Sequence, residues 1–194
     1  LKGLIAKAEL ARLHSKGNTK TVEQVLTRRW KQQNLSTTYY DDYADRFERM
    51  FAGPHARIVD WLEGLAQTTE ITQVIEIGCG DGRALAAMSQ KIPSIHRWTG
   101  VDINATVIAR NHQTYADRDG LEFVAANAIE WLEAHLGPGV LLMTYGGVME
   151  YIAPQTLSDW FKLVAQKGGV GVLLAEPVDH QHDLEANPSS YLWG

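Results

Sequence analysis

Two hydrophobic patterns alternate along residues 71–175. Short runs rich in valine, isoleucine and leucine are typical of buried strands, and each is followed by a segment whose apolar residues recur every three or four positions, as in helices. Strands that alternate with helices are joined by right-handed crossovers. The pattern therefore predicts an α/β fold, with a doubly wound, mostly parallel sheet and helices on both faces. The expected strands are 74–77, 96–103, 121–126, 140–145 and 170–175, and expected helices are 84–88, 129–136 and 154–166.

The first third of the chain shows helical patterns only. They cover residues 1–14, 25–30, 39–51 and 56–66, and Gly53-Pro54 is expected to end the third of them. In the last helix we expect Ile58, Trp61, Leu62 and Leu65 to face the core. We therefore divide the chain into an N-terminal helical extension or lid, residues 1–66, and a core domain, residues 67–194.

Three alternating glycines, Gly78, Gly80 and Gly82, follow the first expected strand. Glycine can adopt positive φ and lets a ligand approach the backbone, while N–H groups at the start of the next helix face the ligand. The turn of a dinucleotide-binding fold needs a small third residue, and Arg83 stands in that place. Glu76, ahead of the first glycine, would repel a pyrophosphate and attract an amino group. The turn therefore favours a ligand with a positive amine over NAD.

A second acidic residue, Asp102, ends the next expected strand. It follows the glycine turn by about 20 residues, a spacing at which a carboxylate can accept hydrogen bonds from both ribose hydroxyls. Capping of the following helix is the alternative role for this aspartate alone. Together with the glycine turn, Asp102 predicts a nucleoside ligand.

These residues give the chain a resemblance to the class I S-adenosylmethionine-dependent methyltransferases. Residues 76–82 are similar to the first motif of that family, Gly100-Val101-Asp102-Ile103 to the second, and Ala126-Asn127-Ala128 to the third. The resemblance implies S-adenosyl-L-methionine as cofactor, with its methionine end at Glu76 and the glycine loop, its ribose at Asp102 and its adenine at Asn127 and Ala128. The full set of cofactor-binding residues that we expect is Glu76, Gly78, Cys79, Gly80, Gly82, Asp102, Ile103, Asn127, Ala128 and Tyr145.

Residues 144–152 follow the fourth expected strand. In family members, this segment faces the transferable methyl group. The Asp/Asn-Pro-Pro-aromatic signature of methyltransferases that act on amide or adenine nitrogens is absent here. Met149-Glu150-Tyr151 is instead similar to the apolar-Glu-His pattern of many small-molecule members, with tyrosine in place of the histidine base. The resemblance makes Glu150 and Tyr151 the candidate catalytic residues, and Tyr145 a further candidate to face the substrate. Hydrogen bonding within the loop is the alternative for each.

A tyrosine cluster, Tyr39, Tyr40 and Tyr43, precedes the core domain. Related small-molecule methyltransferases often fold such a segment over the cofactor, and aromatic rings attract a sulfonium through cation–π interaction. These residues are the expected substrate lid. Packing of the helix against the sheet is the alternative.

Composition and net charge argue against some classes of binding partner. The 194 residues are 45% hydrophobic and carry a net charge of −5, which argues against a sequence-independent grip on nucleic acid. Arg28, Arg29 and Lys31 are interpreted as a solvated helix face. Cys79 is the single cysteine, which fits a cytoplasmic protein without disulfides, and we expect it to fill space in the loop. No apolar run reaches the ~18 residues of a membrane span.

The tail from Glu176 to Asp183 holds several histidine and aspartate residues, which we interpret as a polar loop or a second source of a base, in His180 or His182, rather than a metal site. We also expect the C-terminal strand pair of complete family members to be missing. The predicted function is methyl transfer from S-adenosyl-L-methionine to an oxygen or nitrogen of a small metabolite. An RNA or protein methyltransferase and a non-catalytic nucleoside-binding module are the alternatives.

Overall fold

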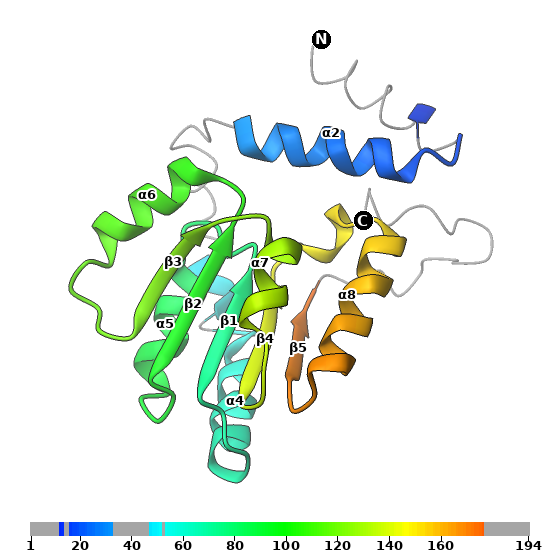
Figure 1. The fold of residues 1–194 in the computed structure, drawn as a ribbon. Coiled ribbons are helices and arrows are strands. Elements are labelled where there is room, and N and C mark those ends of the chain that lie inside the picture. Colours follow the sequence, from blue (N-terminus) through cyan, green and yellow to red (C-terminus); the bar gives the residue numbers. More distant parts are fainter. Residues whose placement is uncertain (1–11, 14–15, 33–46, 52, 177–194) are drawn as a thin grey trace.

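A computed structural model describes residues 12–13, 16–32, 47–51 and 53–176 of the chain (Figure 1). Its centre is a sheet of five parallel strands in the order β3-β2-β1-β4-β5. The strands are β1 (Gln73–Ile77), β2 (Arg97–Asp102), β3 (Leu121–Ala125), β4 (Val140–Tyr145) and β5 (Gly171–Ala175). The α/β fold class with a parallel, doubly wound sheet is confirmed, and every expected strand is present.

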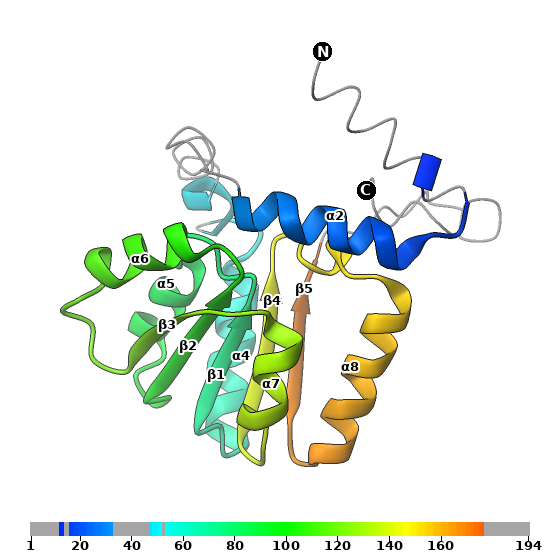
Figure 2. The same cartoon turned by 45° about the horizontal axis from the view of Figure 1, so that its top comes forward.

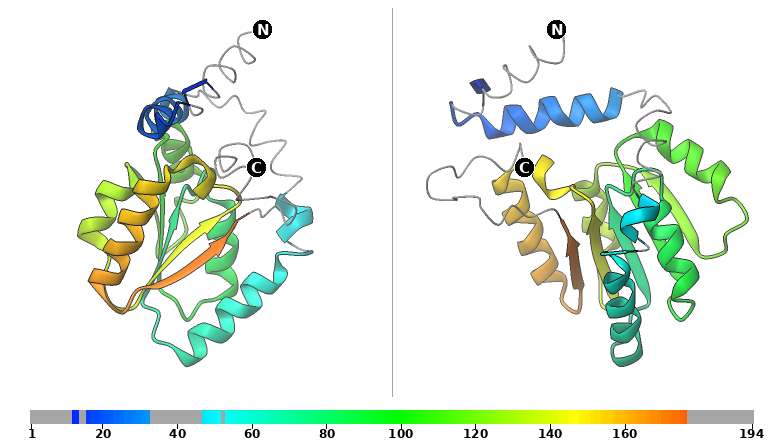
Figure 3. Two further views of the ribbon diagram at one scale, coloured as in Figure 1. Left: turned by 90° about the vertical axis from the view of Figure 1, so that its right-hand side faces the viewer. Right: turned by 180° about the vertical axis from the view of Figure 1, so that it is seen from behind.

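Helices cover both faces of the sheet (Figures 2 and 3). On one face, α4 (Ala56–Thr68), α5 (Arg83–Lys91) and α6 (Ala105–Thr114) bury Leu62, Met88 and Ile108 in one hydrophobic cluster. On the other face, α7 (Ala128–His135) and α8 (Pro154–Lys167) bury Leu132 and Trp160 in a second cluster. The chain alternates between strand and helix because each helix has one apolar face to bury against the sheet.

Two details of the helices differ from the sequence interpretation. Trp61 of α4 is 51% exposed, whereas Val59 and Leu62 are buried, so the expected core role of Trp61 is wrong. Successive residues of a helix are about 100° apart, so Trp61 lies at the edge of the apolar stripe that Leu62 centres. The sequence interpretation also missed α6, which begins where the Asn104 side chain accepts hydrogen bonds from the N–H groups of Thr106 and Val107.

Helix α2 (Thr19–Gln32) lies across the carboxyl ends of the strands, outside the sheet layers (Figures 1 and 2). Its apolar residues Val22 and Leu26 are buried against Leu13 and Tyr151. The α4 helix packs on the sheet and crosses residue 66, where the sequence analysis placed the domain boundary. In the part of the chain that the structure describes, no helix has both the length and the apolar character needed to cross a membrane.

Candidate active site

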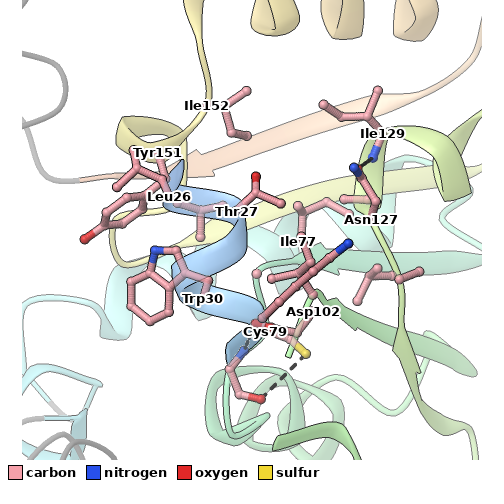
Figure 4. Close-up of a pocket in the computed structure, with 18 of the residues that line it drawn as sticks. Leu26, Thr27, Trp30, Ile77, Cys79, Asp102, Asn127, Ile129, Tyr151 and Ile152 are labelled. Atoms are coloured by element: carbon pink, nitrogen blue, oxygen red, sulfur yellow. Dashed lines mark hydrogen bonds between the residues drawn. The ribbon is translucent and has the colours of Figure 1, made fainter. Parts of the chain in front are cut away.

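A cavity of about 1200 Å³ lies between α2 and the carboxyl ends of the strands. Leu26, Thr27 and Trp30 of α2 approach it from one side, opposite Ile77, Cys79 and Asp102 (Figure 4). Pockets for single small ligands typically measure roughly 300–1,000 Å³. The cavity therefore has room for more than one small molecule.

Most of the expected site residues meet at this cavity. Those that line it are Glu76, Gly78, Cys79, Gly80, Asp102, Ile103, Asn127, Ala128, Tyr145 and Tyr151. Parallel strands bring their carboxyl ends to one edge, which explains how residues so far apart in sequence gather here. Tyr39, Tyr40, Tyr43 and the side chain of Glu150 lie outside the described residues.

The glycine loop after β1 adopts the conformation that its sequence requires. Gly78 and Gly80 have φ of 68° and 52°, in the left-handed region. A Cβ on Gly78 would lie 2.6 Å from a methyl group of Val148. Gly82 has φ of 73° but lies outside the cavity wall, where a Cβ would meet the ring of Phe123 at 2.5 Å. Its place indicates a packing role beneath the loop.

Glu76 is a buried acid in the cavity wall. It stands on the central strand β1, opposite Gly100 of β2 and Met143 of β4, and is 2% exposed. Burial, and then the charges of Asp81 and Asp102, raise the pKa of this carboxyl well above its usual value. Its Oε2 atom is buried, and no donor among the described residues reaches it. An orphaned buried carboxylate is costly unless a donor or cation satisfies it, so Glu76 fits a cationic ligand group.

Asp102 holds the glycine loop against the end of β2. Its Oδ2 accepts a hydrogen bond from the Gly80 N–H at 3.0 Å, and its Oδ1 accepts one from the Asn104 N–H at 2.8 Å. The helix-capping residue is therefore Asn104 and not Asp102. Burial raises the pKa of Asp102. Each carboxylate oxygen keeps a second lone pair for a ligand hydroxyl.

The remaining loop contacts fix the backbone on the side away from the cavity. Asn111 donates to the Gly80 carbonyl at 2.8 Å, the Tyr115 hydroxyl donates to the Asp81 carbonyl at 3.1 Å, and Arg83 forms an ion pair with Asp81 at 2.8 Å. Cys79 is buried, and this burial raises the pKa of its thiol well above the usual value. The thiol is therefore no activated nucleophile, in keeping with its expected role as a filler.

Asn127 caps α7, because its Oδ1 accepts a hydrogen bond from the Ile129 N–H at 3.1 Å. This capping bond fixes the backbone of Asn127 and Ala128 at the end of β3, beside the cavity. The expected adenine-binding residues are thus on a rigid turn between a strand and a helix.

Tyr145 ends β4 and is held by residues that precede the core domain. Its hydroxyl lies 2.5 Å from Nδ1 of His55, and the rings of Phe47 and Phe51 meet it edge-on. Burial, and then the charge of Glu76, raise the pKa of Tyr145 to about 12. Sequence reasoning missed His55, because no spacing or motif connects it to a strand end 90 residues away.

Tyr151 belongs to a short 3₁₀ helix, η1 (Met149–Tyr151), and packs edge-on against Trp30 with ring centroids 5.3 Å apart. Trp30 also lines the cavity wall. Glu176 fixes the loop before η1, because its Oε2 accepts hydrogen bonds from the N–H groups of Val148 and Met149 at 2.8 and 3.3 Å. In the described residues, no group of side chains could hold a metal ion.

The sequence analysis placed α2 within the possible lid, residues 1–66, but named none of its residues at the site. Besides Trp30 and Leu26, this helix places a set of polar and charged side chains at the cavity: Lys20, Glu23, Gln24, Thr27, Arg28 and Lys31. Glu23 ties α2 to the start of α8, since its carboxylate accepts from the Ala153 N–H at 3.3 Å and from the Thr156 hydroxyl at 3.0 Å. The expected solvated face at Arg28 and Lys31 is exposed, but it also borders the cavity.

Comparison with known families identifies the domain that carries the sheet side of this cavity. Residues 74–168 match the family model described as a methyltransferase domain, and they contain the glycine loop and the ends of β2, β3 and β4. Residues 74–168 are a class I methyltransferase domain. The resemblance noted in the sequence is thereby confirmed, as is S-adenosyl-L-methionine as the methyl donor of the domain.

Solved structures agree with the methyltransferase fold. The plantazolicin methyltransferase BpumL in complex with S-adenosylhomocysteine (SAH) is 14% identical, with a TM-score of 0.57 over 89% of this chain and 62% of that chain. A BpumL complex with a triazolic desmethylPZN analog and SAH has a TM-score of 0.52 at 15% identity, over 82% and 56% of the two chains. PKMT2 from Rickettsia typhi with AdoHcy is 23% identical, with a TM-score of 0.43 over 50% and 19%.

The chain spans less than two thirds of the length of each of these structures. At identities of 14% and 15%, the likeness to the two BpumL structures concerns the fold. No curated protein matches the chain significantly. The acceptor of the methyl group must therefore be argued from the site itself.

Proposed function

We propose that this methyltransferase domain transfers a methyl group from S-adenosyl-L-methionine to an oxygen or nitrogen of a small metabolite. The observation that carries the proposal is the buried carboxylate of Glu76, whose Oε2 atom no described donor reaches. The ammonium group of the cofactor is a cation of the kind that such a carboxylate requires. NAD offers no amine at that position, and its pyrophosphate would be repelled.

The other cavity residues suit the rest of the cofactor. Gly78 and Gly80 leave the backbone open to a close approach, and Asp102 has lone pairs for the ribose hydroxyls. Asn127 and Ala128, with Ile103 beside them, would border the adenine. Cys79 fills the space behind the loop.

When bound, the cofactor would supply a methyl group on a sulfonium: the nucleophile of the acceptor would bond to the methyl carbon as the carbon–sulfur bond breaks, with the thioether as leaving group. The chain positions the reactants and excludes water. Tyr145 and Tyr151 line the cavity, and aromatic rings there would suit a cationic ligand. With a pKa raised to about 12, the Tyr145 hydroxyl remains protonated at neutral pH and serves as a positioning group. Glu150 is the proposed group that receives the proton of a hydroxyl or amine acceptor, and the Tyr151 hydroxyl is proposed to orient that acceptor by a hydrogen bond.

Helix α2 covers the cavity, and this cover favours a small methyl acceptor rather than an RNA or a protein. Helix α2 crosses the strand ends and contributes Leu26, Thr27 and Trp30 to the wall (Figure 4). A macromolecular substrate needs an open mouth beside the methyl group. We therefore propose that residues 1–66 include a lid, with α2 as its roof and Tyr39, Tyr40 and Tyr43 as further lid residues.

The test is calorimetric titration of the protein with SAH, NAD and 5′-methylthioadenosine, which keeps the nucleoside and thioether but lacks the amino acid. We expect SAH to bind and NAD not to bind. Glu76→Gln should weaken SAH binding by about 10- to 100-fold, because a hydrogen bond to a charged group is worth about 1.5–3 kcal/mol. It should leave 5′-methylthioadenosine binding unchanged, because that ligand has no ammonium group.

Glu122→Gln is the matched control, since Glu122 is an exposed acid on β3 that does not line the cavity. NAD binding, or SAH binding that is indifferent to Glu76→Gln, would contradict the proposal. SAH binding without methyl transfer to any acceptor in a metabolite screen would leave the non-catalytic binding module as the function.

A further inference from the structure

The two sides of the cavity carry opposite charge. Glu76, Asp102 and Asp81 line the sheet side, and Arg83 pairs with the last of these. Lys20, Arg28 and Lys31 line the α2 side, so that α2 contributes more cations than acids even with Glu23 counted. Glu130 of α7 also lines the cavity. The cofactor brings a sulfonium and an ammonium, which suit the acidic side. The cationic side chains of α2 line the same cavity, and no group of the cofactor has been assigned to them.

Arg28 and Lys31 can act together on one ligand group. They are three residues apart on α2, so they stand on the same face within one turn, with a rise of about 4.5 Å between them. Lys20 lies eight residues before Arg28, about 12 Å along the helix axis. A single anion can therefore reach the Arg28–Lys31 pair, while Lys20 stands apart.

Within the part of the chain that the structure describes, no ion pair uses the charges of Arg28 and Lys31. Among the described residues, ion pairs join Arg83 to Asp81 and Lys162 to Asp159, and none engages Arg28 or Lys31. The nearby acid on α2, Glu23, is occupied at the start of α8 by Ala153 and Thr156. The pair is thus available to a ligand.

Helix α2 is held firmly enough to position the pair over the cavity. Val22 and Leu26 are buried, and Trp30 packs edge-on against Tyr151, beside the loop that follows β4. Since the cavity has room for a second molecule, an anion on the pair and the cofactor on the acidic side can be present together.

We propose that Arg28 and Lys31 bind an anionic group, phosphate or carboxylate, of the methyl acceptor, so that the acceptor is a small anionic metabolite. This inference rests on the proposed function. Arginine and lysine are suited to this role because their N–H groups form charge-assisted hydrogen bonds with phosphate and carboxylate oxygens. The anion would anchor the acceptor to α2 while its nucleophile faces the acidic side of the cavity.

The test is an NMR titration of the isotope-labelled, SAH-saturated protein with inorganic phosphate and, separately, with acetate, at constant ionic strength. We expect at least one of the two probes to shift the amide signals of α2 and of residues 145–152. Arg28→Gln and Lys31→Gln should each raise the dissociation constant of that probe about tenfold or more. Arg57→Gln, which removes one charge from the exposed side of α4, should leave it unchanged.

Each other outcome has a definite meaning. Probes that shift nothing on α2, or that bind the variants as they bind the wild type, overturn the proposal. Weaker SAH binding in Arg28→Gln, with 5′-methylthioadenosine binding unchanged, would assign the pair to the cofactor carboxylate and also overturn it. Failure of the wild type to bind SAH, measured before any phosphate is added, refutes the proposed function first and this inference with it.

Discussion

Gly78 shows how closely the loop after β1 is packed. Its φ of 68° is in a region that costs a residue with a Cβ about 1–2 kcal/mol, and an added Cβ would lie 2.6 Å from Val148. Val148 belongs to the segment that follows β4, so one missing methyl group allows two strand ends to meet at the cavity. Conformation and packing therefore both require glycine here.

We expect Gly78→Ala to lower the free energy of unfolding by more than about 1 kcal/mol, because it adds backbone strain and a steric clash. The measurement is urea denaturation followed by circular dichroism. Gly78→Ala with Val148→Ala should recover the part due to the clash. Gly64→Ala in α4 is the matched control, since a Cβ there meets nothing within 4 Å, and it should stabilise the protein by about 0.5–1 kcal/mol. Equal effects at Gly78 and Gly64 would refute this reasoning.

At the scale of elements, α4 shows what decides which helix residues enter the core. Leu62 is fully buried in the cluster that α4, α5 and α6 share, while the larger Trp61 beside it is 51% exposed. The size and hydrophobicity of Trp61 favour its burial, but its position around the helix axis places it at the edge of the apolar stripe. Burial in this element follows from the angle of the apolar stripe.

Leu62→Ala is expected to destabilise the protein by about 2–5 kcal/mol, the usual range for deleting a buried leucine side chain. Trp61→Ala should change the stability by less than about 1 kcal/mol, because half of its surface is already in water. Thermal unfolding of both variants gives the comparison. A larger loss for Trp61→Ala than for Leu62→Ala would show that α4 is rotated from its described orientation.

The parts that the sequence predicted well are those set by local pattern. Runs such as Val74–Ile77 and Val140–Tyr145 are apolar because both faces of a central parallel strand are buried, and the parallel order then gathers Glu76, Asp102 and Asn127 at one edge. His55 and Glu23 could not be found in this way. Their partners, Tyr145, Ala153 and Thr156, are brought to them only by tertiary packing.

At the scale of the whole molecule, three acidic groups with raised pKa values meet at one cavity. Burial is the largest cause for Glu76, Asp81 and Asp102 alike. In each case the folded protein favours the protonated form more than the unfolded chain does. The free energy of unfolding that these groups contribute is therefore fully present below their unfolded pKa, about 4, and is lost as the pH rises through their folded pKa.

We expect the melting temperature of the ligand-free protein to fall as the pH is raised from 5 to 8, because these buried carboxyls must then ionise. Glu76→Gln should flatten that decline, since the amide does not titrate. SAH should raise the melting temperature more at pH 8 than at pH 5, because its ammonium group pairs with ionised Glu76. Differential scanning calorimetry at several pH values supplies the readout. If the melting temperature of Glu76→Gln falls with pH as much as that of the wild type, groups other than Glu76 cause the fall.

The hydrogen bonds of Glu23 link α2, which covers the cavity, to α8, which packs on the sheet. Ala153 stands just before α8 and donates its N–H to Oε1 of Glu23, and the Thr156 hydroxyl in the first turn of α8 donates to Oε2. Any movement that lifts α2 away from the strand ends must therefore break these two hydrogen bonds to the start of α8. Such a movement would leave the Ala153 N–H and the Thr156 hydroxyl without their acceptor, so the strength of two hydrogen bonds outside the cofactor residues contributes to the free-energy cost of opening the cavity.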